Sequence, residues 1–201
     1  MKDLKNSVAI ITGSSSGVGA ATAKLLAGEG CHVLINYNSN SAGAEAVAEE
    51  CRAMGVECLV FGGSVAEGAN CVAMVTEAIE KWGRVDILVN NAGTTKFVDH
   101  SDLDGLSSDD FQRIYAVNVI GSYQMIRAVS EQMKFQEGGG AVVNVASTAA
   151  VTGIGSSVAY AASKGALVTM TLSLARALGP KLRINAVCPG FIEGDWLREG
   201  L

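Results

Sequence analysis

Tyr160 and Lys164 are the residues of this chain whose types and spacing point most directly to chemistry. They are four residues apart on an expected helix, so they share one of its faces. An ammonium group beside a phenol favours the phenolate and lowers a tyrosine pKa from its usual value near ~10. The pair therefore predicts a side chain that gives or takes a proton near neutral pH.

Ser147 is a second candidate, two residues past an expected strand at 141–145 and thirteen residues before Tyr160. Ligands of open α/β sheets gather at the carboxyl ends of strands, so its hydroxyl can face the same substrate oxygen as the phenol. Taken alone, Ser147 is more typical of a capping or strand-end serine than of a catalytic residue.

A glycine-rich turn follows the first apolar run of the chain. Gly13, Gly17 and Gly19 allow a tight turn and a close approach of a ligand to backbone N–H groups, and the next helix N-terminus favours a phosphate. The spacing is G-x-x-x-G-x-G, which differs from the commonest dinucleotide fingerprint, but its place between the first strand and the first helix is where a dinucleotide binds.

The same turn offers an alternative. Residues 13–17 also read G-x-S-x-G, the pattern of a hydrolase nucleophile elbow with Ser15 as the nucleophile. This hypothesis requires a later acidic residue and a histidine, and only His100 in a polar loop is available for that role.

Apolar runs and amphipathic segments alternate along the chain. Strands are expected at 8–11, 33–35, 56–61, 85–89, 141–145 and 182–187, and helices at 19–28, 42–54, 69–82 and 157–178. A long helical region at 109–133 is either continuous or broken, and residues 94–108 form a polar loop that is a surface segment or an edge of the site. The alternation predicts one doubly wound α/β domain, residues 1–201, with a parallel sheet covered by helices on both faces.

Composition excludes several classes of protein. The net charge is −5 with no basic stripe, so a nucleic-acid partner is not expected. Five cysteines, an odd number without C-x-x-C, favour reduced thiols in the cytoplasm. We expect no signal peptide, no membrane-spanning segment and, with only two histidines, no metal site.

In their order along the chain, five motifs resemble those of the short-chain dehydrogenase/reductases. The motifs are T-G-x3-G-x-G at 12–19, N-N-A-G at 90–93, Ser147, Y-x3-K at 160–164 and P-G at 189–190. The likeness is best to the group of bacterial 3-oxoacyl-(acyl-carrier-protein) reductases, over about residues 5–195. It implies a Rossmann-type fold and hydride transfer between a nicotinamide and a carbonyl or alcohol substrate, such as a 3-oxoacyl thioester.

The resemblance also implies roles for individual residues. Tyr160 is the general acid in reduction and the base in oxidation, Lys164 lowers its pKa and bonds the nicotinamide ribose, and Ser147 holds the carbonyl oxygen. Asn118 matches a fourth catalytic residue that supports a proton relay through water; without the resemblance it is a polar residue in a helical pattern that bonds backbone. The expected cofactor contacts are Gly13, Ser15, Ser16, Gly17, Val18, Gly19, Tyr37, Asn38, Ser64, Val65, Asn91, Ala92, Gly93, Tyr160, Lys164, Pro189, Gly190 and Ile192.

The end of the second strand bears on which nicotinamide is bound. NAD-preferring relatives place there an acidic residue that bonds the ribose 2′-OH. Tyr37 stands at about that position with no carboxylate nearby, which favours NADP(H) over NAD(H). Ser16 and Asn38 occupy the positions where an arginine or lysine usually clamps the 2′-phosphate.

The chain departs from the family pattern at three places. Ser64 precedes Val65 where the family has aspartate at an adenine contact, and Gly194 stands where threonine is frequent. Relatives also continue past the position of Leu201 through a substrate-covering segment and a seventh strand, so we expect the C-terminal strand to be missing. The missing end keeps open a second interpretation, a catalytically silent NADP-binding regulator.

The helix at 157–178 has more apolar positions than one core contact needs, namely Leu167, Met170, Leu174 and Leu178. They serve either the core or a helix-to-helix contact between subunits. The resemblance favours a homotetramer or a homodimer.

Overall fold

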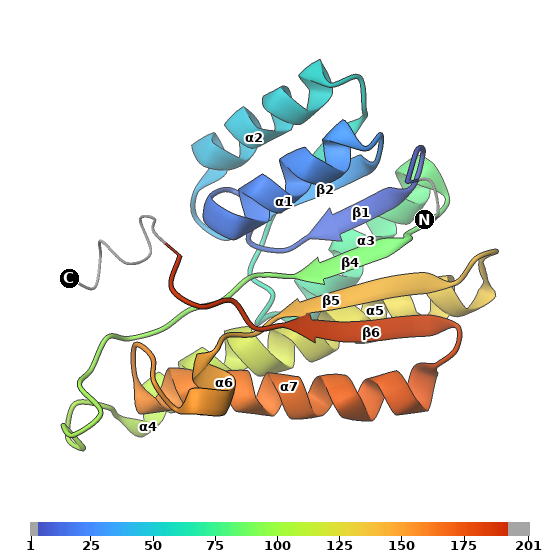
Figure 1. The fold of residues 1–201 in the computed structure, drawn as a ribbon. Helices are drawn as coiled ribbons and strands as arrows, with labels where there is room; N and C mark the ends of the chain where they lie inside the picture. Colours follow the sequence, from blue (N-terminus) through green and yellow to red (C-terminus); the bar gives the residue numbers. More distant parts are fainter. Residues whose placement is uncertain (1–3, 193–201) are drawn as a thin grey trace.

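Six parallel strands form the centre of the molecule, and helices pack on both faces of the sheet (Figure 1). The computed structural model describes residues 4–192. The strands are β1 (Val8–Ile11), β2 (His32–Tyr37), β3 (Cys58–Gly62), β4 (Ile87–Asn90), β5 (Gly140–Val145) and β6 (Leu182–Val187). Their order is β3-β2-β1-β4-β5-β6, so the direction of winding reverses between β1 and β4. This order confirms the predicted doubly wound sheet.

The helices divide between the two faces of the sheet. They are α1 (Gly17–Gly28), α2 (Ser41–Ala53), α3 (Gly68–Trp82), α4 (Ser108–Tyr115), the π-helix η1 (Ala116–Gly121), α5 (Ser122–Phe135), α6 (Ala149–Thr152) and α7 (Val158–Leu178). One apolar cluster joins α1 and α2 to the sheet. The other joins α3 and α5 to the sheet, and the end of α7 packs against it. Buried strand residues on both faces explain why the strands read as continuous apolar runs.

Several element boundaries differ from the sequence prediction by one or two residues. The third strand begins at Cys58 instead of position 56, and the fourth begins at Ile87 instead of position 85, although Val85 is buried. The predicted helical region at 109–133 is interrupted by η1, where the extra residue of a π-turn changes which side chains face inward. The single-turn helix α6 was not predicted, because four residues ended by Gly153 carry no helical period.

The helix α7 is long and apolar enough, by length and composition alone, to cross a membrane. Its most apolar window has a mean hydropathy of 1.2, and 28% of that window is buried. Helices of soluble cores pass the same test, and α7 packs against β6 and α6 in this fold.

Candidate active site

A cleft of about 1610 Å³ lies at the carboxyl ends of the strands, where the winding of the sheet reverses. Its walls come from the β1–α1 turn, the segments that follow β2, β3, β4, β5 and β6, and the first turn of α7. All five motifs singled out in the sequence therefore contribute residues to one place, although they are far apart along the chain. Such a position is the expected ligand site of an open α/β sheet.

Close packing fixes the β1–α1 turn at one end of the cleft. A Cβ atom on Gly13 would lie 2.8 Å from the Ala92 Cα, and one on Gly19 would lie 2.5 Å from the Gly13 carbonyl oxygen. Gly17 has a φ of +55° and open space around it. The Ser16 side chain makes no capping hydrogen bond at the start of α1, which leaves the first N–H groups of the helix for a phosphate.

Two asparagines hold this turn in place, and one of them was missed by the sequence analysis. Asn91 donates from Nδ2 to the carbonyls of Thr12 and Gly13, each at 2.9 Å. Asn36 accepts from the Gly13 N–H at 3.1 Å, and its own N–H donates to the Ser14 hydroxyl. Asn36 is buried, and an amide that directly follows the apolar residues of β2, near the carboxyl end of the strand, was the signal that could have identified it.

Tyr160 lies in the first turn of α7 and lines the cleft together with Ser147. The helix begins there because the Ser157 hydroxyl accepts a hydrogen bond from the Tyr160 N–H. The hydroxyls of Ser147 and Tyr160 are hydrogen-bonded. Burial raises the pKa of Tyr160, and the hydrogen bond with Ser147 opposes this increase only in part. The predicted decrease of this pKa is therefore wrong.

Lys164 explains why the prediction failed. Its ammonium group donates to the Val145 carbonyl at 2.8 Å and lies 5.6 Å from the centroid of the Tyr160 ring. The side chain is buried, and this burial lowers the pKa of Lys164 itself to about 8. Because desolvation acts on both groups, each neutral form gains stability, and this outweighs the attraction between ammonium and phenolate.

Asn118 lies in the π-helix η1 and is fully buried. Its Oδ1 accepts from the Thr94 N–H at 2.8 Å, and its Nδ2 donates to the Thr94 carbonyl and to Ser163 Oγ, each at 3.0 Å. Ser163 Oγ in turn donates to the Tyr160 carbonyl. The amide of Asn118 thus connects the segment after β4, at Thr94, to the N-terminal part of α7, at Ser163.

Most expected cofactor contacts line the cleft. They are Gly13, Ser15, Ser16, Gly17, Val18, Asn38, Ser64, Val65, Asn91, Ala92, Gly93, Tyr160, Lys164, Pro189, Gly190 and Ile192. Gly19 and Tyr37 are not among the lining residues. Gly19 packs behind the turn, and the Tyr37 hydroxyl lies against Gly62 on β3, because side chains of successive strand residues point to opposite faces. Gly194 lies outside the described residues.

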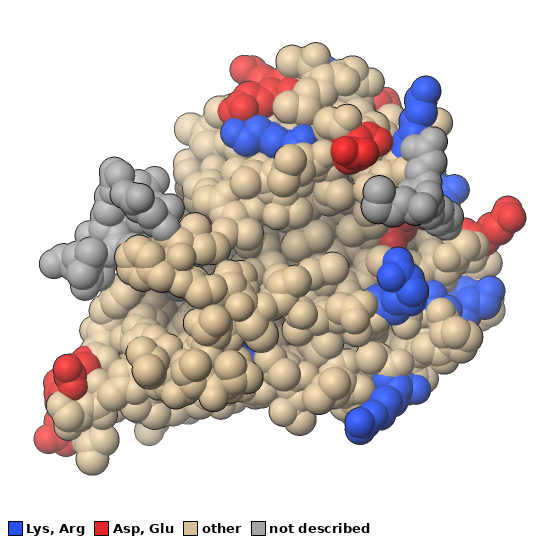
Figure 2. Space-filling view, in the orientation of Figure 1, with Lys and Arg blue, Asp and Glu red and all other residues tan. Residues whose placement is uncertain are grey.

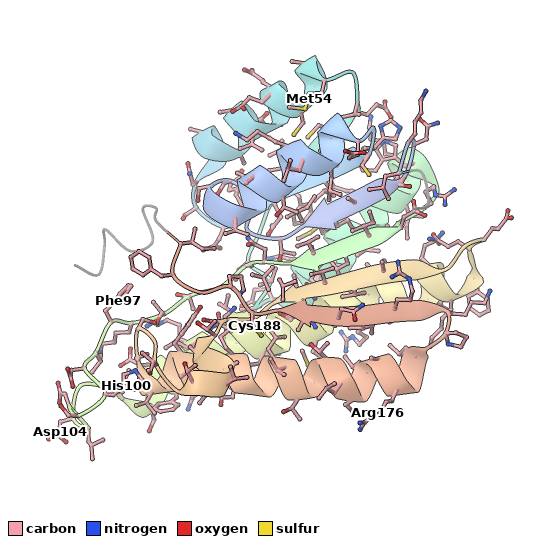
Figure 3. All side chains as sticks on the ribbon, in the orientation of Figure 1. Met54, Phe97, His100, Asp104, Arg176 and Cys188 are labelled. Atoms are coloured by element: carbon pink, nitrogen blue, oxygen red, sulfur yellow. The ribbon has the colours of Figure 1, made fainter. Side chains whose placement is uncertain are left out.

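The β4–α4 loop forms a wall of the cleft. The sequence had left open whether residues 94–108 are a surface segment or an edge of the site. Phe97 and Val98 from this loop line the cleft, as do Ile154 and Ser156 from the α6–α7 loop. Figure 3 shows Phe97 and His100 at the end of the molecule toward which the strands point. The sequence pattern did not predict that these residues line the cleft, because their positions depend on how the two loops pack against each other.

The hydrolase hypothesis for Ser15 is contradicted by the positions of both histidines. His32 begins β2, at the amino end of a strand whose carboxyl end borders the cleft, and stacks on Trp82. His100 bonds the Gly155 carbonyl through Nε2. Ser15 therefore has no imidazole beside it to act as a base.

Comparisons with known proteins identify the family of this chain. The family model described as short chain dehydrogenase matches residues 7–199. The chain is 39% identical to an uncharacterized oxidoreductase of Thermotoga maritima, covering 97% of this chain and 75% of that protein. It is 36% identical to the 3-oxoacyl-(acyl-carrier-protein) reductase FabG of Staphylococcus epidermidis, covering 94% and 77%. The crystal structure of an NAD⁺-bound xylitol dehydrogenase superposes with a TM-score of 0.91 at 33% identity, covering 98% of this chain and 76% of that one.

The chain belongs to the short-chain dehydrogenases, an oxidoreductase family that binds nicotinamide cofactors. The residues present fit such a cofactor: the glycine turn admits no side chain at Gly13 or Gly19 without a clash, and the cleft runs from there to Tyr160. Gly93, which also lines the cleft, lies beside the ammonium group of Lys164, with 3.7 Å between that nitrogen and a Cβ placed on the glycine. The sequence-based identification of the family is thus confirmed.

Proposed function

We propose that this protein transfers a hydride between NADP(H) and a carbonyl or alcohol substrate, with Tyr160 as the acid in reduction. The observation that carries the proposal is the hydrogen-bonded pair of Tyr160 and Ser147 in the cleft, one helical turn from the buried Lys164. A bound nicotinamide supplies the hydride chemistry, and the protein has to supply a proton and hold the substrate oxygen.

The side chains divide this work. The raised pKa of Tyr160 keeps its phenol protonated at neutral pH, so the phenol can donate a proton to a carbonyl oxygen. The Ser147 hydroxyl, already bonded to that phenol, is placed to hold the same oxygen. Lys164 stays charged below about pH 8 and places its positive charge where the phenolate forms after the proton has left.

Preference for NADP(H) is supported by the wall of the cleft beyond β2. This wall carries Asn38, Ser39 and Asn40, and Ser16 faces it from the β1–α1 turn. Among the described residues that line the cleft, Asp99 is the one carboxylate, and it belongs to the β4–α4 loop at the other end. The ratio of kcat/KM for NADPH and NADH tests this preference. Asn38→Asp is expected to reverse it, because a carboxylate repels the 2′-phosphate; a wild type that prefers NADH overturns it.

A 3-oxoacyl thioester is the first substrate to test, because one relative is a 3-oxoacyl-(acyl-carrier-protein) reductase. Loss of NADPH absorbance with an acetoacetyl thioester measures the reaction directly. Tyr160→Phe is expected to lower kcat at least a thousandfold while the dissociation constant of NADPH changes little. Activity of the variant within tenfold of the wild type overturns the role of Tyr160. Tight NADPH binding without turnover on thioesters, ketones, sugars and steroids favours the silent regulator instead.

We propose further that the protein is a homo-oligomer that pairs through α7. Leu172 on this helix is 55% exposed, and a groove lined mainly by alanines and glycines lies between α6 and the first turns of the same helix. Figure 2 shows few charged side chains over α6, α7 and β6. Sedimentation velocity tests this assembly: Leu172→Glu is expected to yield monomers, and a monomeric wild type overturns the proposal.

Free thiols at all five cysteines support a reducing, cytoplasmic location.

A further inference from the structure

The two ends of the cleft differ in chemistry. The end near the β1–α1 turn is lined by serines and asparagines, which suit a nucleotide. The other end, beyond Tyr160, is bordered by Phe97, Ile154 and Phe191, which come from three separate segments of the chain. These three side chains are 37%, 78% and 81% exposed. We call Phe97, Ile154 and Phe191 the apolar rim.

Hydrogen bonds fix two of the three rim segments to each other. Thr95 Oγ1 and Ser156 Oγ are 2.6 Å apart, and the Val98 N–H donates to the Ser156 carbonyl at 2.9 Å. His100 bonds the Gly155 carbonyl at 3.1 Å. The β4–α4 loop is therefore joined to the α6–α7 loop on both sides of Phe97 and directly after Ile154, and the rim is a built feature of the cleft.

The charged groups near the rim are already engaged. The Asp99 carboxylate accepts from the N–H and the hydroxyl of Ser101, at 2.8 and 2.6 Å. The Arg113 guanidinium donates to Thr94 Oγ1 and to Asp110, each at 3.3 Å. Neither group is directed as an unpaired charge at a ligand, so apolar surface dominates recognition at this end of the cleft.

We propose that the apolar rim binds an extended hydrocarbon chain next to the carbonyl of the substrate, so that the enzyme selects medium-chain acyl or alkyl ketones over sugars and polyols. The proposal rests on the proposed function, since Tyr160 and Ser147 hold the oxygen at the inner end of the same cleft. Each methylene that the rim removes from water raises kcat/KM by about fourfold. A sugar offers hydroxyl groups, and the rim has no partners for them.

The test is a chain-length series. Ethyl 3-oxobutanoate, 3-oxohexanoate, 3-oxooctanoate and 3-oxodecanoate are reduced with NADPH, with D-xylulose as the polar comparison. Wild-type kcat/KM is expected to rise by roughly 15-fold per two methylenes until the chain passes the rim. Phe97→Ser and Ile154→Ser are expected to lower kcat/KM for the longest reduced ester at least tenfold more than for the shortest ester.

The chain offers matched controls. Leu103 and Val151 are 82% and 73% exposed, lie near Phe97 and Ile154 along the chain, and do not line the cleft. Leu103→Ser and Val151→Ser are expected to keep the wild-type dependence on chain length. A flat series, a preference for D-xylulose, or an equal loss in the controls overturns the apolar rim as the selective feature.

A binding measurement separates this proposal from the reaction itself. Calorimetric titration of the NADP⁺ complex with butanamide, hexanamide and octanamide is expected to show affinity rising with chain length in the wild type and in Tyr160→Phe. Ile154→Ser is expected to abolish the increase. If binding follows chain length but no ester is reduced, the rim proposal stands and the proposed function fails; if binding ignores chain length, the rim proposal fails even where esters are reduced.

Discussion

Replacing Lys164 by methionine is expected to inactivate the protein and yet to stabilise it at neutral pH. Burial lowers the pKa of Lys164 from 10.5 to about 8. A tenfold change in a protonation equilibrium corresponds to about 1.4 kcal/mol, so keeping the ammonium group inside the protein costs roughly 3 kcal/mol below pH 8. Methionine fills a similar volume without this cost. It also leaves the Val145 carbonyl without its hydrogen-bond donor, and this loss reduces the gain in stability by about 1 kcal/mol.

The sign of the pH dependence follows from proton binding. Between about pH 8 and pH 10.5 the native lysine is neutral, whereas the unfolded chain still binds its proton. The stability of the wild type therefore rises with pH in this window relative to the variant, and the advantage of Lys164→Met disappears. Urea unfolding of both proteins at pH 7 and pH 10 measures this difference. Lys134→Met, at an exposed lysine, is the control and is expected to show no such change.

Two results would refute this reasoning. One is a Lys164→Met variant less stable than the wild type at pH 7, which would mean that the ammonium group stabilises the fold. The other is a stability difference that stays constant between pH 7 and pH 10, which would mean that Lys164 keeps an ordinary pKa.

Three further predictions concern the supports of the site. Gly19→Ala is expected to weaken NADPH binding more than tenfold by fluorescence titration, because its Cβ would lie 2.5 Å from the Gly13 oxygen; Gly165→Ala, with no neighbour closer than 3.6 Å, should bind normally. Asn36→Leu is expected to lose about 2–4 kcal/mol in urea unfolding, since it leaves the Gly13 N–H and two carbonyls unpaired; a loss below 1 kcal/mol would contradict this. Asn118→Leu is expected to lower kcat about tenfold or more with little change in NADPH affinity, because the two bonds to Thr94 are lost; an unchanged kcat would exclude a positioning role.

The sequence predicted the order of the elements because most strands are buried apolar runs and the helices α1, α2, α3 and α7 end at or near a glycine. It could not predict α6 or the register of η1. A single turn carries no period, and a π-turn is set by packing between helices and not by local propensity. The start of β4 was misplaced because Val85 is buried without being paired in the sheet.

The candidate catalytic residues could be predicted where they belong to a sequence motif. The burial of their side chains could not. Tyr160, Lys164 and Ser147 do converge on one cleft. The direction of the Tyr160 pKa was predicted wrongly because spacing along a helix shows the neighbouring charge but not the depth of burial. Tyr37 was predicted to contact the cofactor because it stands at the end of β2. The pleat of that strand directs its side chain toward Gly62 instead.

The π-helix η1 imposes a constraint on length that ordinary helices lack. One residue fewer between α4 and α5 would restore a regular helix there, and α5 would rotate by about 100° relative to α4. Met125, Ile126, Val129 and Met133 would then leave the interior, while Asn118 would lose Thr94. Substitutions in this stretch act on one side chain at a time, whereas a deletion of a single residue would disturb the core and the catalytic centre together.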